Sequence, residues 1–241
     1  MSNPFGKLYL IPTRLGDNPP LEVLPISIKK IIEETDHYIV ENEKTARRFI
    51  KRVSPGKSQA KLKFKTLNKF TDLSELPSFL DDCLSGYSIG LLSEAGCPAI
   101  ADPGSDIVSL AHEKNVQVIP MVGPSSIVLA LMSSGMNGQG FTFNGYLPID
   151  SNERKFKIKE LEKRSVQLQQ SQIFIETPYR NNKMLEELIK HLNPETRICV
   201  ACDLTLPTEY IKTMTSKNWS KTNVDLHKSC LLYTSPSPRD S

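Results

Sequence analysis

The chain has 241 residues, enough for one large domain or two small ones, with 39% hydrophobic and 24% charged residues. Its 30 lysines and arginines and 27 acidic residues give a net charge of +3, too small to indicate a nucleic-acid-binding protein by itself. Prolines, serines and Gly123 interrupt the most apolar stretch, residues 116–132, so we expect no membrane span. No basic segment leads into an apolar one at Met1, so we expect a cytoplasmic protein.

The cysteines and histidines give no sign of a metal site. The five cysteines have no framework spacing, and the four histidines are scattered. Cys199 and Cys202 have the CxxC spacing, but residues 197–201 have the pattern of a buried strand. Residues three apart on a strand point to opposite faces, so we expect reduced core thiols and no bound metal.

The first half of the chain alternates short apolar strands with helical segments. Strands are predicted at residues 7–12, 37–40, 62–66, 88–92 and 116–121. Helices are predicted around Ile28, Ile31 and Ile32, and at residues 44–53, 73–85 and 105–114. This alternation is typical of βαβ units and predicts an α/β fold with a parallel sheet.

The second half repeats this pattern. A helix ending near residue 134 is followed by strands predicted at 141–147, 172–176, 197–201 and 208–215. Helices are predicted at 154–169 and 181–191, and a short helix or turn at 217–221. We therefore predict an N-terminal α/β domain over residues 1–121 and a C-terminal α/β domain over residues 122–228.

The last residues, 229–241, do not look like the end of an α/β domain. The segment SCLLYTSPSPRDS resembles translated adapter sequence, and Pro236 and Pro238 are incompatible with a central strand. We expect a non-native tail that adds no strand, so that the second sheet lacks its closing strand; the alternative is a genuine disordered tail.

Three turns rich in small residues follow predicted strands, at residues 12–16, 93–104 and 123–126. Ligands of parallel sheets bind outside the carboxyl ends of the strands, where small residues let the backbone approach a ligand closely. Any strand-to-helix loop also needs turn residues and a cap, so one such turn alone would carry little weight. No nucleotide-binding GxxxxGK[ST] or GxGxxG motif and no GxSxG hydrolase motif is present.

The segment SEAGCPAIADPG, residues 93–104, resembles the S-[DE]-A-G-x-P-x-x-x-D-P-G signature of the tetrapyrrole methylase superfamily, the class III S-adenosylmethionine methyltransferases. The nearest branch is that of the 16S ribosomal RNA 2′-O-ribose methyltransferases. Further segments resemble this branch in the same order: LYLIPTRLGD near the start, residues 120–126, 135–148 and 174–180, and CDLT at 202–205 followed by Glu209. Residues 41–48 depart from it, because a D-T-R-type segment is usual there.

The resemblance implies two α/β/α domains of the tetrapyrrole methylase type, S-adenosyl-L-methionine in a cleft between them, and a homodimer. Carried onto this chain, it implies the donor-binding residues Pro12, Gly16, Ser93, Glu94, Ala95, Gly96, Asp102, Pro103, Gly104, Ser125, Ser126, Thr177, Asp203, Leu204 and Thr205.

A ribose hydroxyl is a weak nucleophile, and its methylation calls for proton removal. The candidate catalytic residues are Glu94, Asp102 and Glu176. Asp102 is equally well explained as a helix N-cap, and Glu176 as the partner of Arg180 in a structural ion pair.

Residues 44–69 contain ten lysines and arginines and no acidic residue, the pattern expected for contact with a phosphate backbone. A solvated surface is the alternative. The candidate RNA-binding residues are Lys44, Arg47, Arg48, Lys51, Arg52 and Arg180. The second charged run, residues 153–164, mixes both signs and is typical of an exposed helix.

These patterns favour an S-adenosylmethionine-dependent methyltransferase that acts on a ribose 2′-hydroxyl of ribosomal RNA, with 16S RNA or the small ribosomal subunit as its partner. One alternative is a methylase of a tetrapyrrole or another small molecule. The other is a family member that binds the donor or RNA without catalysis.

Overall fold

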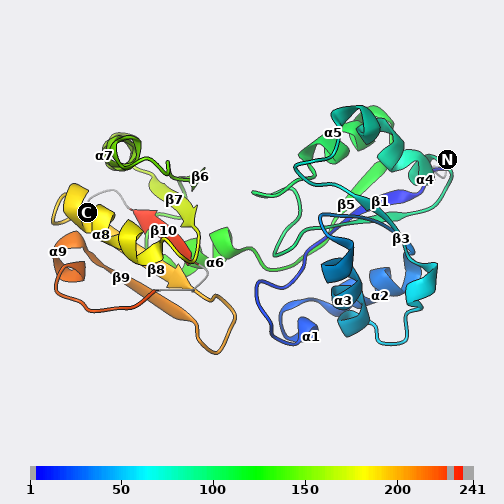
Figure 1. The fold of residues 1–241 in the computed structure, drawn as a ribbon, viewed down its shortest axis with the longest axis horizontal. Coiled ribbons are helices and arrows are strands. Elements are labelled where there is room, and N and C mark those ends of the chain that lie inside the picture. Colours follow the sequence, from blue (N-terminus) through cyan, green and yellow to red (C-terminus); the bar gives the residue numbers. More distant parts are fainter. Residues whose placement is uncertain (1–3, 227–230, 236–241) are drawn as a thin grey trace. The chain divides into compact units, whose positions relative to one another are not determined.

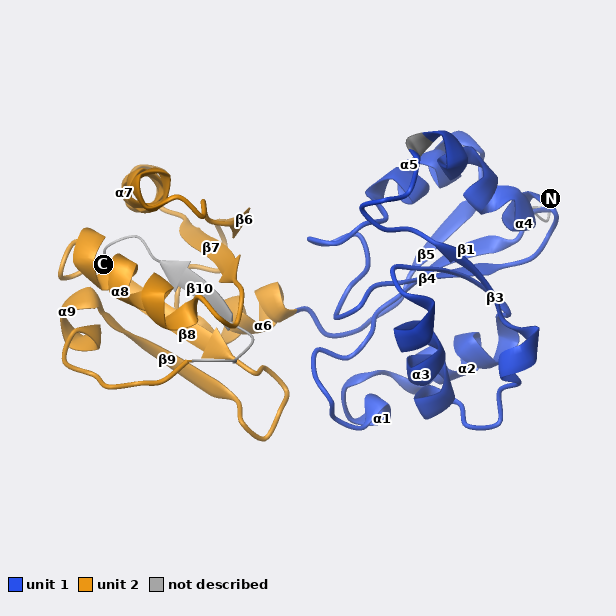
Figure 2. Cartoon of the chain, viewed as in Figure 1, with its two compact units in different colours: residues 1–125 blue, residues 126–241 orange. Residues whose placement is uncertain are grey.

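The computed structural model describes residues 4–226 and 231–235, with the backbone alone described at Leu73 and at 231–235. Two compact units follow one another along the chain, residues 1–125 and 126–241 (Figure 2). The domain boundary expected from the sequence, after residue 121, lies four residues before the division between these units. The cleft expected to bind the methyl donor between the two domains stays a prediction. Each unit contains one five-stranded sheet with helices, so the predicted α/β class is confirmed.

The first unit is built on a wholly parallel sheet. Its strands are β1 (Lys7–Ile11), β2 (His37–Val40), β3 (Lys63–Thr66), β4 (Ile89–Leu92) and β5 (Gln117–Pro120). They lie in the order β3-β2-β4-β1-β5. β1, β2 and β4 are largely buried, as expected for central strands covered on both faces.

Helices cover both faces of this sheet (Figure 1). They are α1 (Pro20–Val23), α2 (Ile26–Glu34), α3 (Glu43–Val53), α4 (Asp81–Leu84) and α5 (Ser105–Glu113), with the 3₁₀ helices η1 (Gln59–Lys61) and η2 (Leu73–Leu80). On one face, α2 and α3 contribute Ile28 and Ile50 to the core, and on the other, η2 and α5 contribute Leu80 and Ile107.

The segment predicted as one helix over residues 73–85 is a 3₁₀ helix followed by a single α-helical turn. Pro77 lies inside it. Because proline lacks the N–H that an α-helix needs and clashes with the preceding turn, it disfavours a regular α-helix there.

After β1 and after β4, the chain crosses the sheet in opposite directions. β2, the strand after β1, lies beyond β4, whereas β5, the strand after β4, lies beyond β1. The loops that follow these two neighbouring strands therefore diverge toward opposite faces of the sheet. Such a switch point leaves a crevice at the carboxyl ends of the strands, where α/β proteins bind their ligands.

The second unit has a mixed sheet in the order β6-β7-β10-β8-β9. Its strands are β6 (Phe141–Tyr146), β7 (Ser171–Glu176), β8 (Arg197–Cys202), β9 (Tyr210–Thr215) and β10 (Leu231–Ser235). Its helices are α6 (Ser126–Ser134), α7 (Ser151–Leu168), α8 (Asn181–His191) and α9 (Ser216–Trp219). β6 and β7 are parallel, while β10 runs antiparallel to β7 and β8, and β9 antiparallel to β8.

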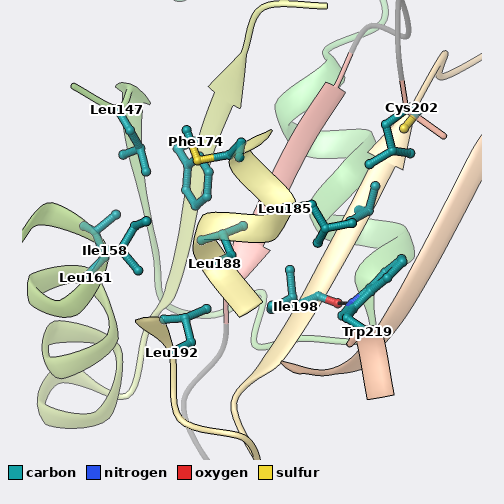
Figure 3. Packing of buried hydrophobic residues seen from close by; sticks show 13 residues of the cluster. Leu147, Ile158, Leu161, Phe174, Leu185, Leu188, Leu192, Ile198, Cys202 and Trp219 are labelled. Carbon is teal, nitrogen blue, oxygen red and sulfur yellow. Dashed lines mark hydrogen bonds between the residues drawn. The ribbon is translucent and has the colours of Figure 1, made fainter. Parts of the chain in front are cut away.

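The core of this unit lies between the sheet and helices α7, α8 and α9 (Figure 3). Trp219 is 1% exposed, and its indole Nε1 donates a hydrogen bond to the Ile198 carbonyl over 2.9 Å. Phe174, Leu185 and Leu188 pack in the same cluster. Cys199 and Cys202 are both buried on β8, as expected for core thiols.

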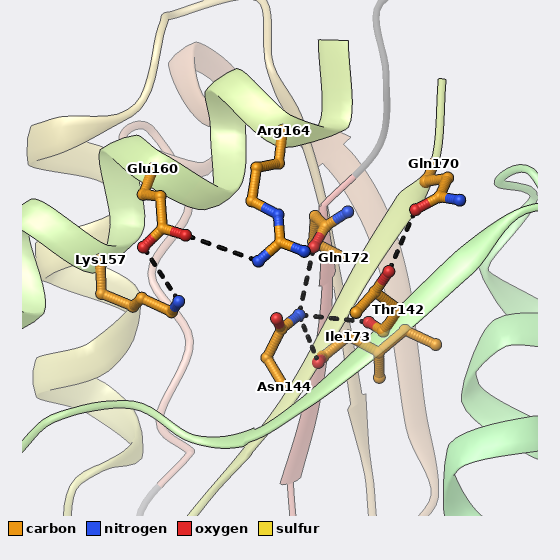
Figure 4. A network of polar contacts seen from close by, with 8 residues as sticks. All are labelled: Thr142, Asn144, Lys157, Glu160, Arg164, Gln170, Gln172 and Ile173. Carbon is orange, nitrogen blue, oxygen red and sulfur yellow. Dashed lines mark hydrogen bonds and ion pairs between the residues drawn. The ribbon is translucent and has the colours of Figure 1, made fainter. Parts of the chain in front are cut away.

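A polar network joins the edge strand β6 to β7 (Figure 4). β6 has a register irregularity between Phe143 and Tyr146, and Asn144, which lies within it, donates to Gln172 Oε1 and to the Ile173 carbonyl over 3.2 Å each. Glu160 of α7 pairs with both Lys157 and Arg164. These contacts are structural, in agreement with the reading of α7 as an exposed helix with mixed charges.

The expectation that the tail adds no strand is wrong for residues 231–235. These residues form β10, which pairs with β7 and β8 inside the sheet. The two prolines lie beyond the last residue of the strand, at 236 and 238, so they do not interrupt its hydrogen bonds. The rest of the predicted tail lies outside the described residues.

Within the described parts of the chain, no helix is long and apolar enough to cross a membrane. Over the same residues, no group of three or more His, Cys, Asp or Glu side chains is arranged to hold a metal ion.

The central position of β10 can be tested with Leu232→Pro. Loss of a backbone donor inside a sheet should lower the free energy of unfolding by about 3 kcal/mol. The chain has a single tryptophan, Trp219, so its fluorescence during urea unfolding reports on this unit. Asn223→Pro, in an exposed irregular segment, is the matched control and should change little. Equal unfolding midpoints for the two variants would contradict the assignment of β10.

Candidate active site

Loops that follow strands of the first sheet meet at its carboxyl edge. Three of them, at residues 12–19, 93–104 and 121–125, follow β1, β4 and β5 and correspond to the turns singled out in the sequence, the last of which ends at Ser126 in α6. Two direct contacts between these loops hold them together.

The first contact joins the loops after β1 and β4. The Thr13 N–H donates to the Gly96 carbonyl over 2.9 Å, and the Thr13 hydroxyl donates to the Ser93 carbonyl over 3.3 Å. The Ser93 hydroxyl donates to the Gly96 carbonyl over 3.1 Å. Thr13 and Ser93 are both buried, so the two loops form one unit at the switch point.

The second contact brings in the loop after β5. Cys97 Sγ lies 3.5 Å from the Pro124 carbonyl oxygen. A Cβ atom at Gly123 would lie 2.3 Å from Pro12 Cβ, so only glycine permits this approach. The structure therefore brings together the three loops that the sequence pointed to.

The loop after β4 has an unusual backbone. Gly96 and Gly104 have φ values of +76° and +135°, where glycine is favoured. Ala99 and Ala101 have φ values of 64° and 62°, which alanine rarely adopts. Strained backbone of this kind concentrates at binding and catalytic sites.

A cavity of about 210 Å³ opens between the loops after β1 and β4 and helix α3. Four of the predicted site residues line it, namely Gly16, Arg48, Ser93 and Glu94. Its other polar lining comes from Thr13, Arg14, Asp17 and Thr45, none of which the sequence singled out individually. Thr45 and Arg48 come from α3, whose first turn is capped by the Asn42 side chain.

Three carboxyl groups act on one another at this edge of the sheet. Thr45 Oγ1 lies 2.6 Å from Glu94 Oε1. Burial, followed by the charge of Asp102, raises the pKa of Glu41. Burial, followed by the charge of Glu94, raises the pKa of Asp102. Perturbed carboxyl groups beside a cavity are typical of functional sites.

Glu41 is a site residue that the sequence did not predict, as are Thr13 and Thr45. Its Oε1 atom is buried and has no hydrogen-bond partner among the described residues. The available signal was its position directly after the buried strand β2. For Asp102 the N-cap alternative is wrong, because Gly104 caps α5 and no side chain bonds to that cap.

Most of the predicted RNA-binding cations already have partners. Arg47 pairs with Glu43 at 2.7 Å and lies 4.6 Å above the Phe64 ring. Arg52 pairs with Asp17, and Lys51 donates to the Pro55 carbonyl over 2.6 Å. These cations look unopposed in the sequence because their partners lie outside residues 44–69 or are backbone carbonyls.

Two of the predicted RNA-binding cations have no such partner. Within the described part of the chain, the exposed side chains of Lys44 and Arg48 have neither an ion-pair partner nor a hydrogen-bond partner. Arg48 also lines the cavity.

In the second unit, Glu176, Thr177 and Arg180 form one closed group at the end of β7. Arg180 Nη2 lies 2.6 Å from Glu176 Oε1, which also accepts the Thr177 N–H over 2.6 Å. Arg180 Nε donates to the Thr177 hydroxyl over 3.0 Å. The Glu176 side chain is only 2% exposed. It therefore forms the structural ion pair with Arg180 that was the alternative to a catalytic role.

The predicted residues after β8 form a tight turn. Asp203 and Thr205 have φ values of 49° and 73°, and Leu204 is buried. The Thr205 N–H donates to Glu209 Oε2 over 2.8 Å, and the Thr208 hydroxyl donates to Asp203 Oδ2 over 3.1 Å. Of the remaining pair, Ser125 ends the first unit and Ser126 begins α6.

Known proteins resemble the chain over most of its length. The ribosomal RNA small subunit methyltransferase I of Vibrio cholerae is 31% identical over 216 residues, which cover 86% of this chain and 68% of that protein. The protein of the same name from Halalkalibacterium halodurans is 30% identical over 195 residues, 80% of this chain and 63% of that protein. The chain therefore spans about two thirds of the length of these relatives.

Among solved structures, a diphthine synthase superposes with a TM-score of 0.68 at 16% identity, over 96% of this chain and 90% of that one. That likeness shows a shared fold. The family model of the tetrapyrrole (corrin/porphyrin) methylases matches residues 8–219. The chain therefore belongs to the tetrapyrrole methylase family, whose enzymes are S-adenosyl-L-methionine-dependent methyltransferases.

Proposed function

We propose that this protein transfers a methyl group from S-adenosyl-L-methionine to a ribose 2′-hydroxyl of small-subunit ribosomal RNA. The observation that carries the proposal is the 31% identity to the Vibrio cholerae enzyme, which extends over 86% of the chain. The predicted homodimer and cytoplasmic location stay predictions.

The loops at the carboxyl edge of the first sheet suit the donor. Close approach of backbone to a ligand needs small residues, and Gly96 and Gly104 hold positive φ values in a loop tied to Thr13. Pro12, Gly16 and the segments 93–96 and 102–104 would hold the donor there. When bound, the donor supplies a methyl group on a positively charged sulfur.

Glu94 is the best placed proton acceptor for a substrate hydroxyl, because it alone of the three carboxyl groups lines the cavity. Thr45 Oγ1 lies 2.6 Å from Glu94 Oε1 and 2.9 Å from the Asn42 carbonyl oxygen. Its single proton can serve only one of these acceptors. A proton taken up by Glu94 would complete the second hydrogen bond and remove a charge that acts on Glu41 and Asp102.

The function is tested by donor binding in a calorimeter and by transfer of labelled methyl to unmodified small-subunit ribosomal RNA. We expect both, with the label in 2′-O-methylated nucleotides. Binding of the donor without labelled RNA, or label in a tetrapyrrole instead, would contradict the proposed substrate. No donor binding would contradict methyl transfer altogether.

Glu94→Gln should lower kcat for RNA methylation by about a hundredfold or more, the usual contribution of a general base. The amide keeps the size of the side chain but cannot accept the proton. Single-turnover methyl transfer at saturating RNA measures the effect. Glu113→Gln, on the exposed end of α5, is the matched control and should behave like the wild type. A Glu94→Gln rate within threefold of the control would contradict this role.

The raised pKa values of Glu41 and Asp102 predict a stability cost at neutral pH. An acid with a higher pKa in the folded than in the unfolded state loses stability as pH rises through the folded pKa. Because both groups are partly exposed, Glu41→Gln or Asp102→Asn should gain about 1 kcal/mol or less at pH 7.5, or about 2–4 °C in Tm. The gain should vanish below about pH 4.

Asp72→Asn is a control that should change Tm in the opposite direction. Hydrogen bonds from Ser74 lower the pKa of Asp72, which caps η2, so its replacement should lower Tm at neutral pH. Thermal unfolding from pH 4 to pH 8 measures all three variants. A lower Tm for both Glu41→Gln and Asp102→Asn at pH 7.5 would contradict the raised pKa values.

A further inference from the structure

We propose that Arg48 binds a phosphate of the RNA strand beside the ribose that is methylated, and that the cavity under it receives that ribose. The inference rests on the proposed function and adds the group that selects a nucleic acid.

Helix α3 carries five cations, and internal contacts account for three of them. Arg47 pairs with Glu43, Lys51 bonds to the Pro55 carbonyl, and Arg52 pairs with Asp17. Lys44 and Arg48 remain without a side-chain partner among the described residues, and their i, i+4 spacing puts them on one face of the helix. The binding capacity of α3 for an anion is therefore concentrated on one face.

Arg48 alone of this pair lines the cavity. The other cation in the lining, Arg14, already has partners within the protein. Its Nη2 atom lies 2.8 Å from Asp17 Oδ1, and its Nη1 donates to the Asn18 carbonyl over 2.5 Å. Arg48 is thus the one lining cation of the described residues that is open to a ligand. Its planar guanidinium can bind a phosphate through two parallel hydrogen bonds.

The two walls of the cavity differ in charge in a way that suits a nucleotide. Thr45 lies one turn before Arg48 on α3 and hydrogen-bonds to Glu94. A phosphate is attracted to Arg48 and repelled by Glu94, whereas a hydroxyl can donate to Glu94. In RNA the 2′-hydroxyl is next to the 3′-phosphate, so one nucleotide presents both groups together.

The size of the cavity favours the same ligand. About 210 Å³ is below the roughly 300–1,000 Å³ of sites that enclose drug-sized molecules. A ribose ring fits a space of this size, which is too small to enclose a tetrapyrrole macrocycle. The rest of the RNA would remain outside, on the side of Lys44.

The test compares Arg48→Gln, Arg48→Lys and Lys30→Gln in methylation of unmodified small-subunit ribosomal RNA. Lys30 is exposed on α2, so Lys30→Gln removes one positive charge from the same unit without touching the cavity. We expect Arg48→Gln to raise KM for RNA about tenfold or more with a smaller change in kcat. Its plot of log affinity against log salt should be less steep by about one unit.

Arg48→Lys keeps the charge and loses the paired hydrogen bonds. It should therefore keep the wild-type salt dependence while its KM lies between those of the wild type and Arg48→Gln. If Arg48→Gln matches Lys30→Gln in both KM and salt dependence while the wild type methylates RNA, the role of Arg48 is wrong. If the wild type transfers no methyl to RNA, the proposed function fails and this inference fails with it.

Discussion

The site depends on the topology of the first sheet, in which the chain crosses the sheet in opposite directions after β1 and after β4. Two neighbouring parallel strands feed loops to opposite faces of the sheet, and a crevice remains between them. Left alone, these loops would diverge. The bonds from Thr13 to Gly96 and Ser93 tie them together, and the close approach of Gly123 to Pro12 adds the third loop. The cavity and its charged lining follow from that assembly.

Charge at this site is distributed with a clear asymmetry. Arg47 and Arg52 of α3 pair with Glu43 and Asp17, and Lys51 bonds to a backbone carbonyl, whereas Arg48 is left open at the cavity. The carboxyl groups Glu41, Glu94 and Asp102 instead act on one another, and burial makes ionisation of Glu41 and Asp102 costly. Folds tolerate such a cost chiefly at functional sites, where buried and mutually repelling groups are placed close together.

Much of this architecture could be predicted from the sequence, since apolar strands alternate with amphipathic helices and small-residue turns follow the strands. The features that the sequence did not predict have physical causes. Glu41 and Thr13 matter only because loops distant in the sequence converge, and the partners of Arg47 and Arg52 lie outside the basic segment. Pro77 changed the helix type, and β10 ends just before Pro236, so the proline argument failed there.

The most direct test of the central claim is a crystal structure with S-adenosylhomocysteine, the demethylated donor. We expect the nucleoside to lie against the loops after β1 and β4, in contact with residues 93–96 and 102–104. Its sulfur should be directed toward the cavity between Thr45, Arg48 and Glu94. A molecule bound elsewhere, with the crevice at β1 and β4 filled by side chains, would contradict this claim.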